Sequence, residues 1–241
     1  LDVETMNEIR MALDGLPGGK KILMYGEPWN ASAPAMAEGS VPADKNHACS
    51  LDSRIGIFSD STRDAIRGDV FLRHKKGFVQ GNTAFTNAVK ASLQGWTQHT
   101  FSKPLVNSPS QIVSYVSVHD NLTLWDKLIS STKRGRDYTS YDENIVKMNR
   151  LCAVLYFMAQ GIPLFQAGEE FARTKRGMDN SFHAPRSRNR LEWSREAEFS
   201  SLVQYYLGLI QIRKAYPALR DASVQAAKRM CFADSPAGTV A

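Results

Sequence analysis

Four short runs of apolar and β-branched residues recur along the chain, and each run is followed by acidic or other polar side chains. Segments with apolar residues at three- and four-residue spacing lie between the runs. This alternation indicates repeated βα units around a parallel sheet, so we expect an α/β fold. The expected strands and the polar residues after them are 22–25 before Glu27, 54–58 before Asp60, 112–118 before His119 and Asp120, and 162–165 before Glu169 and Glu170.

Three helices are indicated by capping residues and periodicity. Thr5 and Glu8 form a capping box that predicts a helix over 5–14, and Ser140 and Glu143 form a second box that predicts a helix over 140–160. Residues 198–216 predict a third helix, which ends at Pro217 because proline cannot continue it.

Charge and composition exclude several functional classes. The net charge is +6, but the basic residues are scattered over separate segments, so no nucleic-acid partner is expected. No apolar run is long enough to span a membrane, and residues 1–10 lack the layout of a signal peptide. The three cysteines are odd in number and form no Cys-x-x-Cys pair, which favours a reducing compartment such as the cytoplasm and predicts no zinc site.

The strand ends supply the candidate catalytic residues, because loops after parallel strands converge on one mouth. Glu27 and Asp120 could form the carboxylate pair that glycoside hydrolysis needs. A capping or ion-pair role accounts equally well for an isolated strand-end carboxylate. His119 and Trp29, each taken alone, are more often structural or core residues.

Two sequence motifs favour the catalytic interpretation over the structural one, because they resemble motifs of a known family. The sequences Tyr25-Gly26-Glu27-Pro28-Trp29 and Val118-His119-Asp120-Asn121-Leu122-Thr123-Leu124-Trp125-Asp126 are similar to the fifth- and seventh-strand motifs of the alpha-amylase superfamily, in the form found in type I pullulanases. The resemblance extends to residues 59–68, 160–171, 180–182, Asn189 and Trp193, and so to nearly the whole chain. Ser59 and Pro28 depart from the commoner residues of the family.

The resemblance implies roles for seven residues. Glu27 would be the general acid/base, and Asp120 the carboxylate that stabilises the transition state. His119 would hydrogen-bond sugar hydroxyls, and Trp29 would pack on sugar or hold its loop. The cleft would also be lined by Asn121, Asn180 and Asn189.

The resemblance also implies a domain organisation. Residues 1–221 would form strands five to eight of a (β/α)8 barrel, and 222–241 would begin a C-terminal β domain. The family's nucleophilic aspartate lies in a motif such as Phe-Arg-Phe-Asp. This sequence lacks that motif, so we expect the chain to begin just after the nucleophilic aspartate. The second-strand Asn-His motif is missing as well. Such a piece should be inactive alone and should self-associate or need the missing N-terminal half.

The implied partner is an alpha-glucan, cleaved at alpha-1,6 branch linkages. Two alternatives stay open: an isoamylase-like or amylase-like hydrolase, and a non-catalytic glucan-binding remnant. The segment 174–193 favours the pullulanase type. No cofactor is expected, and no Asp-rich loop supports a structural calcium ion.

Overall fold

The chain folds around a sheet of four parallel strands. The computed structural model describes residues 1–30, 36–133, 135 and 137–233. The strands are β1 (Met24–Gly26), β2 (Ile55–Phe58), β3 (Ile112–Ser114) and β4 (Ile162–Pro163), and their spatial order follows their order in the sequence. Each neighbouring pair is parallel, with Met24 opposite Ile55, Ile57 opposite Ile112 and Val113 opposite Ile162. The predicted α/β class is confirmed.

All four strands are shorter than the apolar runs that predicted them. The β3–β4 ladder ends at the pair Ser114 and Pro163. Just beyond it, the amide of Leu164 donates to the Ser114 carbonyl at 2.9 Å. Residues 115 to 118 are not part of a strand, and they lead directly to His119 and Asp120.

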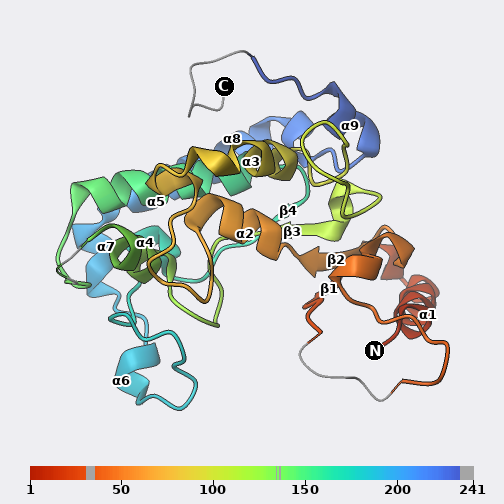
Figure 1. The fold of residues 1–241 in the computed structure, drawn as a ribbon, viewed down its shortest axis with the longest axis horizontal. Helices are drawn as coiled ribbons and strands as arrows, with labels where there is room; N and C mark the ends of the chain where they lie inside the picture. Colours follow the sequence, from red (N-terminus) through yellow and green to blue (C-terminus); the bar gives the residue numbers. More distant parts are fainter. Residues whose placement is uncertain (31–35, 134, 136, 234–241) are drawn as a thin grey trace.

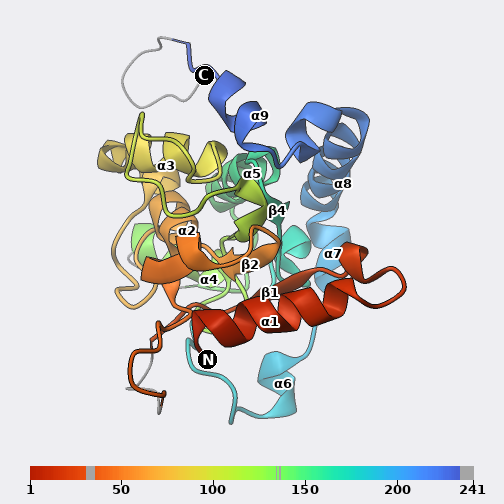
Figure 2. The same cartoon turned by 90° about the vertical axis from the view of Figure 1, so that its right-hand side faces the viewer.

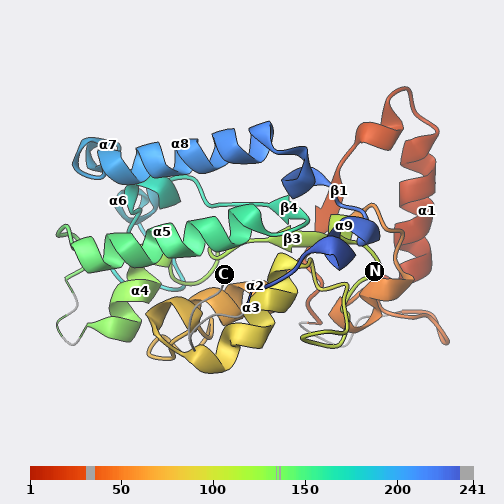
Figure 3. The same cartoon turned by 90° about the horizontal axis from the view of Figure 1, so that it is seen from above.

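Helices connect and cover the strands (Figure 1). The helices α2, α3, α5 and α8 lie along one side of the sheet, with α5 between α8 and the pair formed by α2 and α3 (Figure 3). Helix α1 lies at the end of the molecule that carries β1, and this end faces the viewer in Figure 2. The helix bounds are α1 Val3–Asp14, α2 Asp60–Arg67, α3 Thr86–Leu93, α4 Leu124–Thr132, α5 Glu143–Met158, α6 Arg186–Asn189, α7 Ser194–Glu198, α8 Ser200–Ala215 and α9 Val224–Arg229.

Two predicted helices begin at caps other than those expected. Asp2 caps α1 by accepting from Thr5 N at 2.8 Å, so this helix begins two residues before Thr5. Asp142 caps α5 by accepting from the amides of Asn144 and Ile145, whereas Ser140 lies outside the helix. Aspartate is as good an N-cap as serine or threonine, and the local backbone decides between adjacent candidates.

A glycine and an arginine set the approach of β4 to β3. Gly161 has a φ of +105°, and a Cβ there would lie 2.7 Å from the carbonyl oxygens of both Ile112 and Pro109. Only glycine tolerates this backbone angle and this close approach. The buried guanidinium of Arg213 on α8 donates to the carbonyls of Phe157, Ala159 and Gly161, which ties the end of α5 to the start of β4.

The C-terminal β domain stays a prediction. Residues 224–229 form helix α9, and 230–233 contain no strand. The proposed turn and the second half of the hairpin, 234–241, lie outside the described residues.

The described helices are all too short or too polar to cross a lipid bilayer.

Candidate active site

Three strand-end residues converge at one point. Glu27 follows β1, and His119 and Asp120 follow β3 after four residues that are not part of a strand. One side-chain nitrogen or oxygen atom from each of the three lies within 4.8 Å of the other two. His119 Nε2 lies 3.5 Å from Asp120 Oδ1, and both side chains are largely exposed. Two carboxylates and an imidazole therefore meet at an open surface, where one ligand could contact all three.

The turn that carries His119 and Asp120 is stabilised by buried basic side chains that donate to its backbone carbonyls. Asn121 has a φ of +61°, a left-handed conformation that asparagine tolerates better than most residues. The buried Lys175 donates from Nζ to the His119 carbonyl at 3.1 Å and to Ser181 Oγ at 2.6 Å. Burial lowers the pKa of the Lys175 ammonium. Arg67 donates to the Leu122 carbonyl at 2.8 Å, so both sides of the turn are fixed.

All seven predicted site residues line a group of adjoining cavities, called the cleft below. Glu27 and Trp29 line the first cavity. The second has a volume of about 570 Å³ and is lined by His119, Asp120, Asn121, Asn180 and Asn189, among others. The third joins these two regions, since Trp29, Asp120 and Asn121 all line it together with Asp60.

Asn189 lines the second cavity but has its side chain engaged by the protein. Its Nδ2 donates to the Ser181 carbonyl at 2.7 Å, and its Oδ1 accepts from Ser181 Oγ at 2.9 Å. The amide therefore braces the loop that also carries Asn180. Asn180 is exposed, so its side chain remains open to solvent.

Asp126 is a buried carboxylate that sequence reasoning gave no role. It accepts from the amides of Lys175 at 2.8 Å and Gly177 at 3.0 Å, and from the hydroxyl of Thr174. Burial raises its pKa, and these three donors oppose that shift. Asp126 thereby fixes the loop from which Lys175 supports His119. An acid is common in the first turn of a helix, which conceals this function in the sequence.

The strand-end carboxylates after β4 lie away from the cleft lining. Glu169 is fully buried and accepts from the hydroxyls of Ser117, Tyr156 and Tyr206. Burial raises the pKa of Glu169 to about 7, and the three hydroxyl donors partly offset this effect. Glu170 accepts from the Gly168 amide at 2.9 Å. Both are engaged in the structure and do not line the cavities that hold Glu27 and Asp120.

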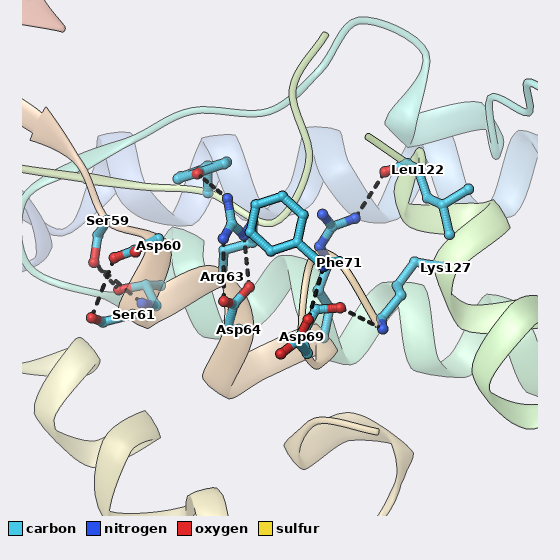
Figure 4. Close-up of polar contacts among 12 residues, drawn as sticks. Ser59, Asp60, Ser61, Arg63, Asp64, Asp69, Phe71, Leu122 and Lys127 are labelled. Atoms are coloured by element: carbon cyan, nitrogen blue, oxygen red, sulfur yellow. Dashed lines mark hydrogen bonds and ion pairs between the residues drawn. The ribbon is translucent and has the colours of Figure 1, made fainter. Parts of the chain in front are cut away.

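Asp60 lies at the cleft but forms an ion pair. Both of its carboxylate oxygens lie 2.9 Å from Lys45 Nζ. On the next turn of α2, the largely buried Arg63 pairs with Asp64 and donates to the Tyr115 hydroxyl at 2.9 Å (Figure 4). The start of α2 therefore contributes charged side chains to the cleft, and these charges are paired with other side chains of the protein.

The three converging side chains also include the residue types that bind metals. Glu27, His119 and Asp120 offer two carboxylates and one imidazole, which are ordinary metal ligands. All three are exposed, and exposed acidic groups commonly lie this close without an ion, so the geometry alone assigns no metal.

The fold and the cleft define a class: an α/β unit whose parallel strands deliver carboxylates to one open mouth. No family model matches the chain. The pullulanase of Bacillus subtilis is 35% identical over 224 residues, which are 91% of this chain and 29% of that protein. The crystal structure of a Paenibacillus barengoltzii pullulanase with maltohexaose and alpha-cyclodextrin matches all of this chain at 37% identity, with a TM-score of 0.89.

A third match lies further away. An isoamylase of Pseudomonas amyloderamosa is 23% identical over 93% of this chain. The chain spans about a third of the length of the pullulanases it matches, 29% of the Bacillus subtilis protein and 36% of the Paenibacillus chain. It belongs to the pullulanases of the alpha-amylase family and corresponds to a segment of their catalytic domain.

Proposed function

We propose that the chain supplies the general acid/base and the transition-state carboxylate of a retaining hydrolase that cleaves alpha-1,6 linkages in alpha-glucans. The convergence of Glu27, His119 and Asp120 within 4.8 Å carries this proposal. Hydrolysis of a glycosidic bond usually requires two carboxyl groups that flank the bond.

In the first step Glu27 donates its proton to the glycosidic oxygen as the bond to the anomeric carbon breaks. A nucleophilic carboxylate forms a covalent bond to that carbon. Asp120 stabilises the positive charge that develops on the sugar ring, and His119 hydrogen-bonds its hydroxyls. In the second step Glu27 accepts a proton from water, whose oxygen attacks the anomeric carbon and releases the nucleophile.

The nucleophile is proposed to come from outside this chain. The family's Phe-Arg-Phe-Asp motif does not occur in the sequence. In this interpretation β1 to β4 correspond to strands five to eight of a barrel, and the preceding strands would bring the nucleophile to the same mouth. The match of this whole chain to 36% of a pullulanase chain, which leaves further residues of that protein to supply other strands, supports that assignment.

The cleft lining favours an alpha-glucan as the ligand. Trp29 lines one cavity with Glu27 and another with Asp120, where its indole ring would offer an apolar face to a sugar ring. The related pullulanase structures contain maltohexaose in one case and maltose in another. Over nearly the whole chain, the identity is 35% to the Bacillus subtilis pullulanase and 23% to the Pseudomonas amyloderamosa isoamylase, which favours a substrate of the pullulanase type.

The test is Glu27→Gln in a protein that joins this chain to a preceding pullulanase segment with the nucleophile. Reducing-sugar release from pullulan should fall by about 10² to 10⁴-fold, since general acid/base catalysis is worth that much. Glu8→Gln, an exposed change on α1, should leave the rate unchanged. Retained turnover in the Glu27 variant would remove Glu27 from this role.

A non-catalytic glucan-binding function is the second candidate, and the missing nucleophile motif favours it for the isolated chain. If pullulan binds to both the wild-type joined protein and the Glu27 variant, and neither hydrolyses it, this alternative replaces the first.

A further inference from the structure

Lys127 on α4 holds a loop together from inside. The side chain is 1% exposed. Its Nζ donates to four carbonyl oxygens of one short loop: those of Asp69 at 2.7 Å, Lys75 at 2.8 Å, Leu72 at 3.0 Å and Arg73 at 3.3 Å. Figure 4 shows Lys127 reaching from α4 toward Asp69. A buried ammonium is tolerated here because four peptide dipoles point their negative ends at it.

The loop of residues 69–75, called the lip below, is also closed at its base. Asp69 Oδ1 accepts from the amides of Phe71 and Leu72, each at 2.8 Å. Gly68 has a φ of +90°, and a Cβ there would lie 2.3 Å from the Lys75 carbonyl oxygen. The two ends of the lip therefore meet, and Lys127 occupies its centre.

The lip presents one aromatic side chain to the cleft. Phe71 is 84% exposed, so it contributes little to the core. It lines the third cavity together with Trp29 and Asp120. An apolar ring at this position would lose its contact with water when a sugar ring covers it, which is the usual gain from an aromatic residue at a binding site.

The lip is also tied to the far side of the cleft. Arg73 forms a 3.0 Å ion pair with Asp179, and Asp179 lines the second cavity next to Asn180. This pair is exposed and contributes little to stability, but it links the lip to the segment that carries Asn180. Lys127 supplies the buried anchor for the same segment.

We propose that Lys127 is a positioning residue, whose ammonium folds residues 69–75 into a lip that holds Phe71 against a sugar bound in the cleft. The identity of the ligand rests on the proposed function. The dependence of the lip on Lys127 rests on the hydrogen bonds alone. The positioning role of Lys127 and the sugar contact of Phe71 can therefore be tested separately.

The first test measures the lip directly in the full 241-residue chain. Trypsin can cut after Arg73, Lys75 and Lys76, all within or beside the lip. Lys127→Met removes the donor and leaves four carbonyls without it, so cleavage at these three bonds should become about tenfold faster or more as the lip opens locally. Lys147→Met, an exposed change on α5, should leave this rate unchanged.

A second variant covers the case in which Lys127→Met unfolds the chain. Asp69→Ala removes the acceptor for two lip amides without touching the core, and it should accelerate the same three cleavages. If Lys127→Met remains folded by circular dichroism and the lip is cut no faster than in the wild type, the proposal is overturned. If trypsin cleaves both variants throughout the chain and not preferentially in the lip, Lys127 supports the whole fold. That result would also overturn the proposal.

The sugar contact is tested by migration of the chain in native gels that contain pullulan. Phe71→Ala should weaken the affinity about fivefold while lip cleavage stays at the wild-type rate. Lys127→Met should weaken the affinity to a similar extent, and the double variant should be no weaker than Lys127→Met, because Lys127 acts through Phe71. Additive losses, or an unchanged affinity in Phe71→Ala, would overturn the sugar-contacting role. Absence of pullulan binding by the wild-type chain would count against the proposed function, and trypsin cleavage would still decide whether Lys127 holds the lip.

Discussion

Ser117 donates a hydrogen bond from its Oγ to Oε2 of the buried Glu169, and Ser117 lies two residues before His119. The other carboxylate oxygen accepts from the hydroxyls of Tyr156 and Tyr206 at 2.8 and 2.9 Å. The segment that carries His119 and Asp120 is therefore tied to an ionisable group in the core.

The first prediction concerns the pH dependence of stability. Burial raises the pKa of Glu169 to about 7 from an ordinary value of 4.5. A carboxyl group with a raised pKa in the folded state contributes stability that is fully present below the unfolded value and is lost as pH rises through the folded value. The free energy of unfolding should therefore fall between about pH 4.5 and 7, by at most about 3 kcal/mol.

Urea denaturation at several pH values checks this. Glu169→Gln should flatten the slope between pH 4.5 and 7, because glutamine does not titrate and can still bond to the three hydroxyls. Glu198→Gln on α7 is the control, since its exposed side chain should leave the slope as it is. An equal slope in wild type and Glu169→Gln would show that other groups govern the pH dependence.

The second prediction uses two glycines with opposite surroundings. Gly161→Ala should lower the free energy of unfolding by about 2 kcal/mol or more, because it combines a left-handed backbone with a clash against two carbonyl oxygens. Gly208→Ala lies inside α8 with open space around it and should raise the free energy by about 0.5–1 kcal/mol. Thermal unfolding of the two variants should give melting temperatures on opposite sides of the wild type, and shifts of the same sign would contradict the described backbone at Gly161.

The third prediction concerns the isolated chain. Four exposed apolar side chains lie before and within β1: Leu16, Ile22, Leu23 and Tyr25. Exposed apolar residues beside an edge strand favour association, so the chain alone should self-associate and should not hydrolyse pullulan.

Light scattering and a reducing-sugar assay measure both parts. Leu23→Lys should shift the chain toward monomer, whereas Leu207→Lys, at a similarly exposed position on α8, should have a smaller effect. An active monomer of wild-type sequence would contradict this prediction and the proposed external nucleophile.

Much of the fold was predictable because polar residues end each strand. The α/β class and the pullulanase resemblance are confirmed, and all seven proposed site residues line the cleft. Their roles, the numbering of the barrel strands and the C-terminal β domain remain predictions. The helix caps were misplaced because Asp2 and Asp142 stood close to equally suitable hydroxyl residues.

Other features had no signal in a single sequence. Glu169 satisfied the same strand-end rule as Glu27, and only its burial separates the two. Lys127 follows the site motif on a helix, where a lysine ordinarily points to solvent. Its role depends on where the carbonyls of residues 69–75 fall, and side-chain type carries no information on backbone placement.

Strand β2 separates β1 from β3, so Glu27 and Asp120 come from strands that do not touch each other. Two strand spacings amount to about 10 Å, yet the functional atoms lie within 4.8 Å. The side chains of Glu27, His119 and Asp120 extend from the strand ends toward one another and close that gap. Substitutions in β2 that contact no sugar, but change the spacing between β1 and β3, should therefore alter the reaction by moving the acid and its partner apart or together.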